Sequence, residues 1–190
     1  QDCYFVGKVT GTSEVGNLVG SLSASASVTN CYYNIELIDP SVPDFGTSSG
    51  DVINSGAKYT MQMTGSNAIG DEGMQFSDAS AWTMTANTDN MAYYPALSAI
   101  ETKQSVNKPY YNIAFDVDDG CTLAAANGFD PNGTVAEGGH YIFTISRDDL
   151  SIPMHVLLNG EEIAPISTEG NTSTFMIDNV TAPQEVTVSF

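Results

Sequence analysis

Two histidines and three cysteines are the side chains in this sequence that could supply a nucleophile and its base. A catalytic thiolate needs an imidazole within hydrogen-bonding reach and a third group that orients that imidazole. Cys121 is the cysteine outside the repeated segment described below, His140 follows two glycines typical of a turn, and His155 lies in an alternating segment with one solvent face. No Asn or Asp stands in a recognisable supporting motif. The sequence therefore predicts no enzyme and no catalytic residue.

Three aspartates close to a glycine carry the oxygen ligands that calcium prefers: Asp116, Asp118 and Asp119. An EF-hand loop needs such ligands at three alternate positions before its glycine and a Glu six residues after it. Gly120 follows Asp119 directly, so the register fails and the segment indicates an ordinary turn. We expect no cofactor. A structural calcium ion elsewhere on so acidic a chain stays open, with no ligands assigned to it.

Adjacent tyrosines occur three times in the sequence, at residues 32–33, 93–94 and 110–111. Neighbouring residues of a strand point to opposite faces, so one ring of each pair can be buried while the other meets solvent. Exposed tyrosine rings suit contacts with sugars or proteins. We therefore take Tyr33, Tyr93 and Tyr110 as candidate ligand contacts, with packing at domain ends as the alternative.

The charge balance excludes two classes of partner. Five Lys and Arg side chains face 23 Asp and Glu, which gives a formal net charge of −18. Such a chain repels phosphate backbones and anionic lipid surfaces. We therefore expect no binding to nucleic acid. No apolar run of about 18 residues is present, so we expect no membrane insertion either. An export signal is not seen at the start, and we expect that it lies upstream or has been removed, so that the chain is a fragment or a mature form.

A repeat is the most informative pattern in the first half. Residues 2–4 (Asp-Cys-Tyr) recur 28 residues later at 30–32 (Asn-Cys-Tyr), with glycines and short Val/Leu pairs between them. Short β-prone segments punctuated by glycine at this period are typical of β-solenoid turns that stack in register. Cys3 and Cys31 would then stack as small apolar side chains, or form a disulfide, since stacked strands lie within bridging distance.

The first hundred residues resemble the GLUG-motif proteins of bacterial surfaces. The resemblance rests on residues 16–20 (Gly-Asn-Leu-Val-Gly), on 28–33 (Val-Thr-Asn-Cys-Tyr-Tyr), and on a close at 94–97 (Tyr-Pro-Ala-Leu). It implies an array of repeats, found in adhesins and beside peptidase domains alike. We expect a short β-solenoid-like segment over 1–100 whose open end is capped by Phe76, Trp82, Met84 and Leu97.

The second half has a different pattern. Residues 101–108 are polar and are predicted to be a linker. Alternating strands and Asn-Gly turns, as at 159–160, follow over 109–190 and predict a small antiparallel β-sandwich. This part resembles the small Ig-like β-repeat modules at the ends of bacterial surface proteins, which usually serve as spacers.

These observations lead to one functional hypothesis and two alternatives. The chain is expected to be an all-β, extracellular or cell-surface bacterial module that is structural or adhesive and not catalytic. It would belong to a larger surface protein and meet a host or cell-surface glycan or protein. The alternatives are a carbohydrate-binding module and an accessory region of a secreted hydrolase or peptidase.

Overall fold

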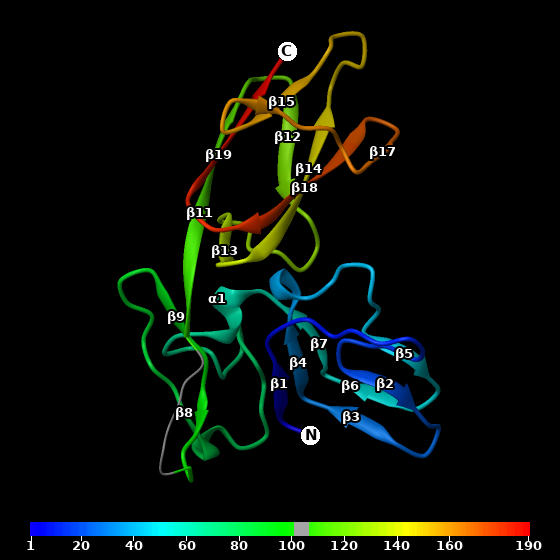
Figure 1. Ribbon diagram of the computed structural model, residues 1–190, viewed down its shortest axis with the longest axis vertical. Helices are drawn as coiled ribbons and strands as arrows, with labels where there is room; N and C mark the ends of the chain where they lie inside the picture. The colour runs from blue at the N-terminus through cyan, green and yellow to red at the C-terminus, as the bar shows by residue number, and fades with distance from the viewer. Residues whose placement is uncertain (101–106) are drawn as a thin grey trace. The chain divides into compact units, whose positions relative to one another are not determined.

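The computed structural model describes residues 1–100 and 107–190, and their structure is dominated by strands (Figure 1). Helix among these residues is limited to α1 (Thr60–Met63) and two short 3-10 turns, Ile35–Leu37 and Ala79–Ala81. None of these helices is long and apolar enough to cross a membrane. The chain divides into two compact units, Gln1–Pro109 and Tyr110–Phe190. The prediction of an all-β protein is confirmed.

The predicted linker is wrong at its end. Residues 101–106 lie outside the described residues, but Asn107 and Lys108 begin strand β11 (Asn107–Val117). Within the first unit, residues 107–109 pair antiparallel with β9 (Met91–Tyr93). The partner strand satisfies the backbone of these polar residues, which composition alone could not reveal.

The first unit is built from passes of the chain that lie in register on one another. One three-stranded parallel sheet has the order β1-β4-β7, and two further parallel pairs are β2 with β5 and β3 with β6. Cys3 lies opposite Cys31, and Tyr33 lies opposite Ala57. The strands are β1 (Cys3–Phe5), β2 (Val19–Leu22), β3 (Ser27–Thr29), β4 (Cys31–Asn34), β5 (Phe45–Ser48), β6 (Asp51–Ile53) and β7 (Gly56–Lys58).

Glycines allow these passes to approach closely. A Cβ atom on Gly46 would lie 2.5 Å from the carbonyl oxygen of Gly20, and one on Gly50 would lie 2.4 Å from that of Ala26. Backbone atoms cannot move aside as a flexible side chain can, so any larger residue would push the turns apart. The glycine punctuation of the sequence is therefore a packing requirement.

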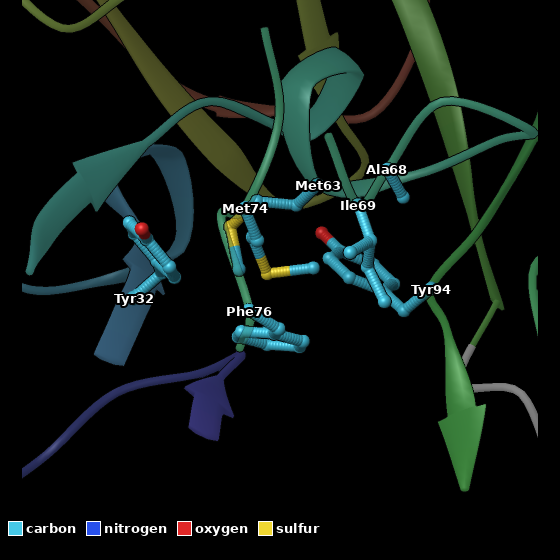
Figure 2. Close-up of a cluster of buried hydrophobic side chains, with 7 residues drawn as sticks. All are labelled: Tyr32, Met63, Ala68, Ile69, Met74, Phe76 and Tyr94. Atoms are coloured by element: carbon cyan, nitrogen blue, oxygen red, sulfur yellow. The ribbon is translucent and has the colours of Figure 1, made fainter. Parts of the chain in front are cut away.

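Strand β4 separates two apolar clusters. Cys31 packs on one face with Leu22 and Val28. Tyr32 packs on the other face, where Met63, Met74 and Phe76 gather between it and Tyr94 (Figure 2). Neighbouring residues of a strand point in opposite directions, so both faces of β4 are covered.

The segment predicted to cap an open end instead covers the face that carries Tyr4 and Tyr32. The Phe76 and Trp82 rings lie 4.9 Å apart, Trp82 also contacts Tyr4, and Met84 packs against the same cluster. Leu97 is 42% exposed and is not part of the cluster. Its strand β10 (Ala96–Leu97) pairs with β8 (Trp82–Thr83) at the margin. Tyr4 and Tyr32, which lie opposite each other in β1 and β4, need this cover because their rings would otherwise be exposed to water.

The second unit contains two sheets. The orders are β13-β11-β19-β15-β16 and β12-β14-β18-β17. The Phe115 ring of the first sheet meets Phe143 of the second at 5.3 Å, and Phe143 stacks on Phe175 at 5.4 Å. The strands not yet given are β12 (Cys121–Ala125), β13 (Thr134–Ala136), β14 (Gly139–Arg147), β15 (His155–Leu158), β16 (Glu161–Glu162), β17 (Ser167–Glu169), β18 (Thr172–Val180) and β19 (Gln184–Ser189).

One strand pair departs from the predicted antiparallel arrangement. The last strand, β19, runs parallel to β11, with Phe115 opposite Val186, while its other edge pairs antiparallel with β15. Alternation of side chains is the same in parallel and antiparallel strands, so the sequence pattern could not distinguish them. The Asn159-Gly160 turn does join β15 and β16 as a two-residue hairpin, with positive φ at both residues.

Candidate functional site

Three corners of the first unit have the same backbone conformation. Asp2, Asn30 and Asn54 have φ values of 54°, 52° and 46°, and each lies at the turn into one strand of the β1-β4-β7 sheet. Asn and Asp adopt this left-handed conformation more readily than other residues with side chains. The chain therefore turns the same corner three times.

The residue after each corner repeats a second contact. Cys3 and Cys31 donate their Sγ hydrogens to carbonyl oxygens two residues earlier, at 3.2 and 3.3 Å, and Ser55 does so with its hydroxyl at 2.9 Å. The two thiols are in register, as predicted, and both are free, so the disulfide alternative is not formed. The third corner does not stand out in the sequence because Ser55 replaces Cys there. What the corner at Asn54 shares with the corner at Asn30 is an Asn followed by a residue with a small hydrogen-bond donor.

A ladder of side-chain hydrogen bonds joins the three corners. Asn54 Nδ2 donates to Asn30 Oδ1 at 2.9 Å, and Asn30 Nδ2 donates to Asp2 Oδ1 at 2.9 Å. Ser77 of the covering segment closes the ladder, donating its backbone N–H to Asp2 Oδ1 at 3.0 Å and accepting from Asn30 Nδ2. Desolvation by itself would raise the pKa of Asp2, but the hydrogen bonds from Ser77 and Asn30 outweigh it and lower that pKa.

A groove lies beside strands β1, β2 and β3 of the first unit. Strand β4 has a neighbour on each side, β1 and β7, whereas β2 and β3 pair only with β5 and β6 among the described strands. A cavity of about 510 Å³ lies there, lined by side chains that include Phe5, Val9 and Val28. Cys3 borders it and is exposed, although Cys31 in the same register is buried. Asn17 also lines the cavity; it is 4% exposed, and its Oδ1 atom is buried without a hydrogen-bond partner in the described chain.

A fully buried polar network fastens the covering segment to the end of β4. Asn34 Nδ2 donates to Thr60 Oγ1 at 2.8 Å and to the Tyr94 hydroxyl at 2.6 Å, while Thr60 donates its backbone N–H and its hydroxyl to the two carboxyl oxygens of Glu36. All four residues are buried, and burial, with the nearby Glu36 charge, raises the pKa of Tyr94. Solvent does not reach these groups, so the network positions structure and offers no accessible reactive group.

The three tyrosines predicted as ligand contacts differ in their burial. Tyr33 is 4% exposed and donates its hydroxyl to Asp44 at 2.6 Å, and burial, reinforced by Asp44, raises its pKa. It is therefore not a surface contact, because both faces of β4 are covered. Tyr93 is half-buried in the first unit beside the fully buried Tyr94, and Tyr110 is half-buried in the second unit.

The candidate nucleophile and bases occupy different places in the second unit. Cys121 pairs with Arg147 at the far end of β14 from His140, roughly 23 Å along the strand. Burial and nearby carboxylates raise the pKa of the Cys121 thiol, which disfavours the reactive thiolate. His140 is buried against Phe129, whereas His155 is exposed and contacts Glu162 at 3.0 Å.

Among residues 1–100 and 107–190, no group of three or more His, Cys, Asp or Glu side chains is placed to hold a metal ion. Comparison of the chain with protein-family models, with curated proteins and with solved structures gives no match. The distinctive arrangement is therefore the ladder of stacked corners with the groove beside its first turn.

Removing the ladder amide should destabilise the first unit. Asn30→Gly keeps the left-handed corner but loses the bonds to Asp2 and Asn54, and we expect a loss of about 2 kcal/mol in the free energy of unfolding. Asn30→Ala should cost about 1 kcal/mol more, because alanine disfavours this φ. Trp82, the one tryptophan of the chain, lies in the first unit and reports urea unfolding by its fluorescence. Asn90→Gly, at an exposed corner with φ of 57°, is the matched control. Equal effects at positions 30 and 90 would contradict a stabilising ladder.

The ladder should also weaken in acid. The folded pKa of Asp2 lies below its usual 3.8, so its contribution to stability is complete above that pH and is lost as pH falls through the folded pKa. We expect Asp2→Asn, which cannot titrate but suits the corner, to reduce the loss of first-unit stability between about pH 6 and pH 3. The measurement is the urea midpoint of Trp82 fluorescence at each pH. An unchanged pH dependence in the variant would rule out this role for Asp2.

Proposed function

We propose that this chain is a non-catalytic structural or adhesion module of a bacterial cell-surface protein, with a first unit that forms the end of a β-solenoid of the GLUG type. The observation that supports this most directly is the threefold repetition of one corner, at Asp2, Asn30 and Asn54, joined by a continuous side-chain ladder. Repeated corners in register are what a stacked array requires, since each turn contacts only its neighbours.

The groove offers a surface to which a preceding part of a larger protein could bind. Thr29, Asn30 and Cys31 lead from β3 into β4, and residues 1–3 repeat that corner at the start of β1. A preceding pair of strands would follow the unpaired edges of β2 and β3, and would cover Cys3 as Leu22 and Val28 cover Cys31. The second unit would then be the Ig-like β-sandwich spacer that follows the solenoid.

The remaining features agree with display outside the cell. A net charge of −18 keeps a surface protein soluble and disfavours nucleic acid and anionic lipid as partners. A host or cell-surface glycan or protein is the expected partner. The carbohydrate-binding alternative loses one candidate contact, since Tyr33 is buried, and retains Tyr93 and Tyr110. An accessory role beside a secreted hydrolase or peptidase would need a catalytic domain outside this sequence.

The solenoid proposal predicts that the groove accepts another half-turn of the same pattern. A copy of residues 16–28 placed directly before Gln1 should pair with β2 and β3 and bury Cys3. In a Cys121→Ser background, we expect the reaction of Cys3 with a thiol reagent to slow about tenfold or more, and the urea midpoint of Trp82 fluorescence to rise. The control is the same 13 residues in scrambled order. Equal protection by both extensions would count against stacked turns.

The non-catalytic role predicts binding without turnover. The chain should be retained on some members of an array of host glycans and matrix proteins, tested with and without calcium, and should release no cleaved product from them. Heat-unfolded chain serves as the control. Product release that depends on the folded chain would contradict the proposal.

A further inference from the structure

A second cavity, of about 530 Å³, lies in the second unit. One wall comes from β15 and β16 of one sheet, and the other comes from β17 and β18 of the second sheet. The loop of residues 163–165 lines it as well. Met154, Ile163 and Pro165 are apolar lining residues that are not buried, while Val156 and Phe175 form the buried floor. A cavity of this size can hold a small ligand or the end of a peptide.

The only arginine of the chain, Arg147, lines this cavity. Its backbone is held by Asn171, which accepts from the Arg147 N–H at 2.9 Å and donates its Nδ2 to the Arg147 carbonyl at 3.0 Å. Its side chain is half-buried: Nη1 donates to the carbonyl of Ile152 at 3.4 Å, and Nε is buried without a hydrogen-bond partner in the described chain. No carboxylate among the described residues lies within ion-pair distance of it.

A guanidinium in this state is matched by a carboxylate. Its donors form a planar fork, and a carboxylate can accept from two of them at once. Leaving a buried charged donor unpaired costs more than an ordinary hydrogen bond gains. Although the chain has 23 acidic side chains, none among the described residues pairs with this guanidinium, which is therefore open to an external carboxylate.

The surroundings of Arg147 limit the ligand further. Thr168, which shares a hydrogen bond of 3.1 Å with the buried Ser173, is exposed on the cavity wall and offers a neutral polar contact. Glu162, held by His155 at 3.0 Å, also lines the cavity and disfavours a second negative charge. A ligand with a single negative charge therefore fits better than a phosphate dianion.

Two exposed apolar residues, Ile152 and Ile166, are bonded to residues that line the cavity. The large exposed hydrophobic residues of the second unit are Leu150, Ile152 and Ile166. Ile152 provides the carbonyl that contacts Arg147, and Ile166 follows the cavity-lining Pro165. Apolar surface of this kind, next to a concave site, favours a ligand with an apolar portion.

We propose that this cavity binds a carboxylate attached to an apolar group, with Arg147 pairing with the carboxylate and Met154, Ile163 and Pro165 contacting the apolar portion. The carboxylate can come from a free amphiphilic acid or from the C-terminus of a peptide with apolar final residues. This site is independent of the stacked corners of the first unit.

The test is calorimetric titration of the full chain with hexanoate and with hexanamide, which has nearly the same shape and no charge. We expect hexanoate to bind about tenfold or more tightly than hexanamide. Arg147→Gln should weaken hexanoate binding by a similar factor, and Arg147→Lys should weaken it less, because lysine keeps the charge but loses the fork. Glu162→Gln should strengthen binding, since it removes a repelling charge.

Lys8→Gln is the matched control, because it removes one positive charge from an exposed position in the first unit. Equal binding of the acid and the amide, or equal affinity of Arg147→Gln and Lys8→Gln, overturns the proposal, and the ligand comparison holds even where a variant folds poorly. A short peptide ending in Phe-Leu, with a free or an amidated C-terminus, identifies the source. Tighter binding of the free form than of hexanoate assigns a peptide C-terminus, and the reverse assigns a free acid.

Discussion

The hydrogen-bonded ladder through Asp2, Asn30 and Asn54 is the interaction on which the first unit depends. The Asn54 side chain donates a hydrogen bond to that of Asn30, which donates to Asp2 in turn. Each of these corners has the left-handed conformation that only a few residue types adopt readily. The ladder fixes the register of the turns. A shift of one residue would exchange the two faces of every strand and place Cys31 where Tyr32 now packs.

This register requires a second apolar cluster, on the other face of β4. Cys31 faces the interior of the turns, so Tyr32 must face outward, and the segment from Thr60 to Tyr94 covers it. The buried network around Glu36 holds this cover in place through hydrogen bonds from Thr60. A carboxyl group at such depth is tolerable only because its oxygens have partners. The aromatic cover and the polar network thus both result from the alternation of one short strand.

Sequence patterns predicted the parts of this arrangement that depend on local chemistry. The repeat at residues 2–4 and 30–32 gave the pairing of Cys3 with Cys31, and Asn159-Gly160 gave a hairpin. Non-local features escaped detection. Nothing near Tyr33 in the chain indicates that both faces of β4 would be covered, and alternation does not distinguish the parallel β11–β19 pair from an antiparallel one. Both depend on segments distant in the sequence.

Two polar atoms show where the described chain leaves a buried group unsatisfied. Asn17 Oδ1 lines the groove of the first unit, and Arg147 Nε belongs to a side chain that lines the cavity of the second. Elsewhere this fold satisfies even a fully buried carboxyl group, at Glu36. Unpaired buried polar groups destabilise a fold and are rare in native structures. Their coincidence with the two cavities is best explained if each cavity is completed by an external group: a polypeptide strand in the groove, and a carboxylate beside Arg147.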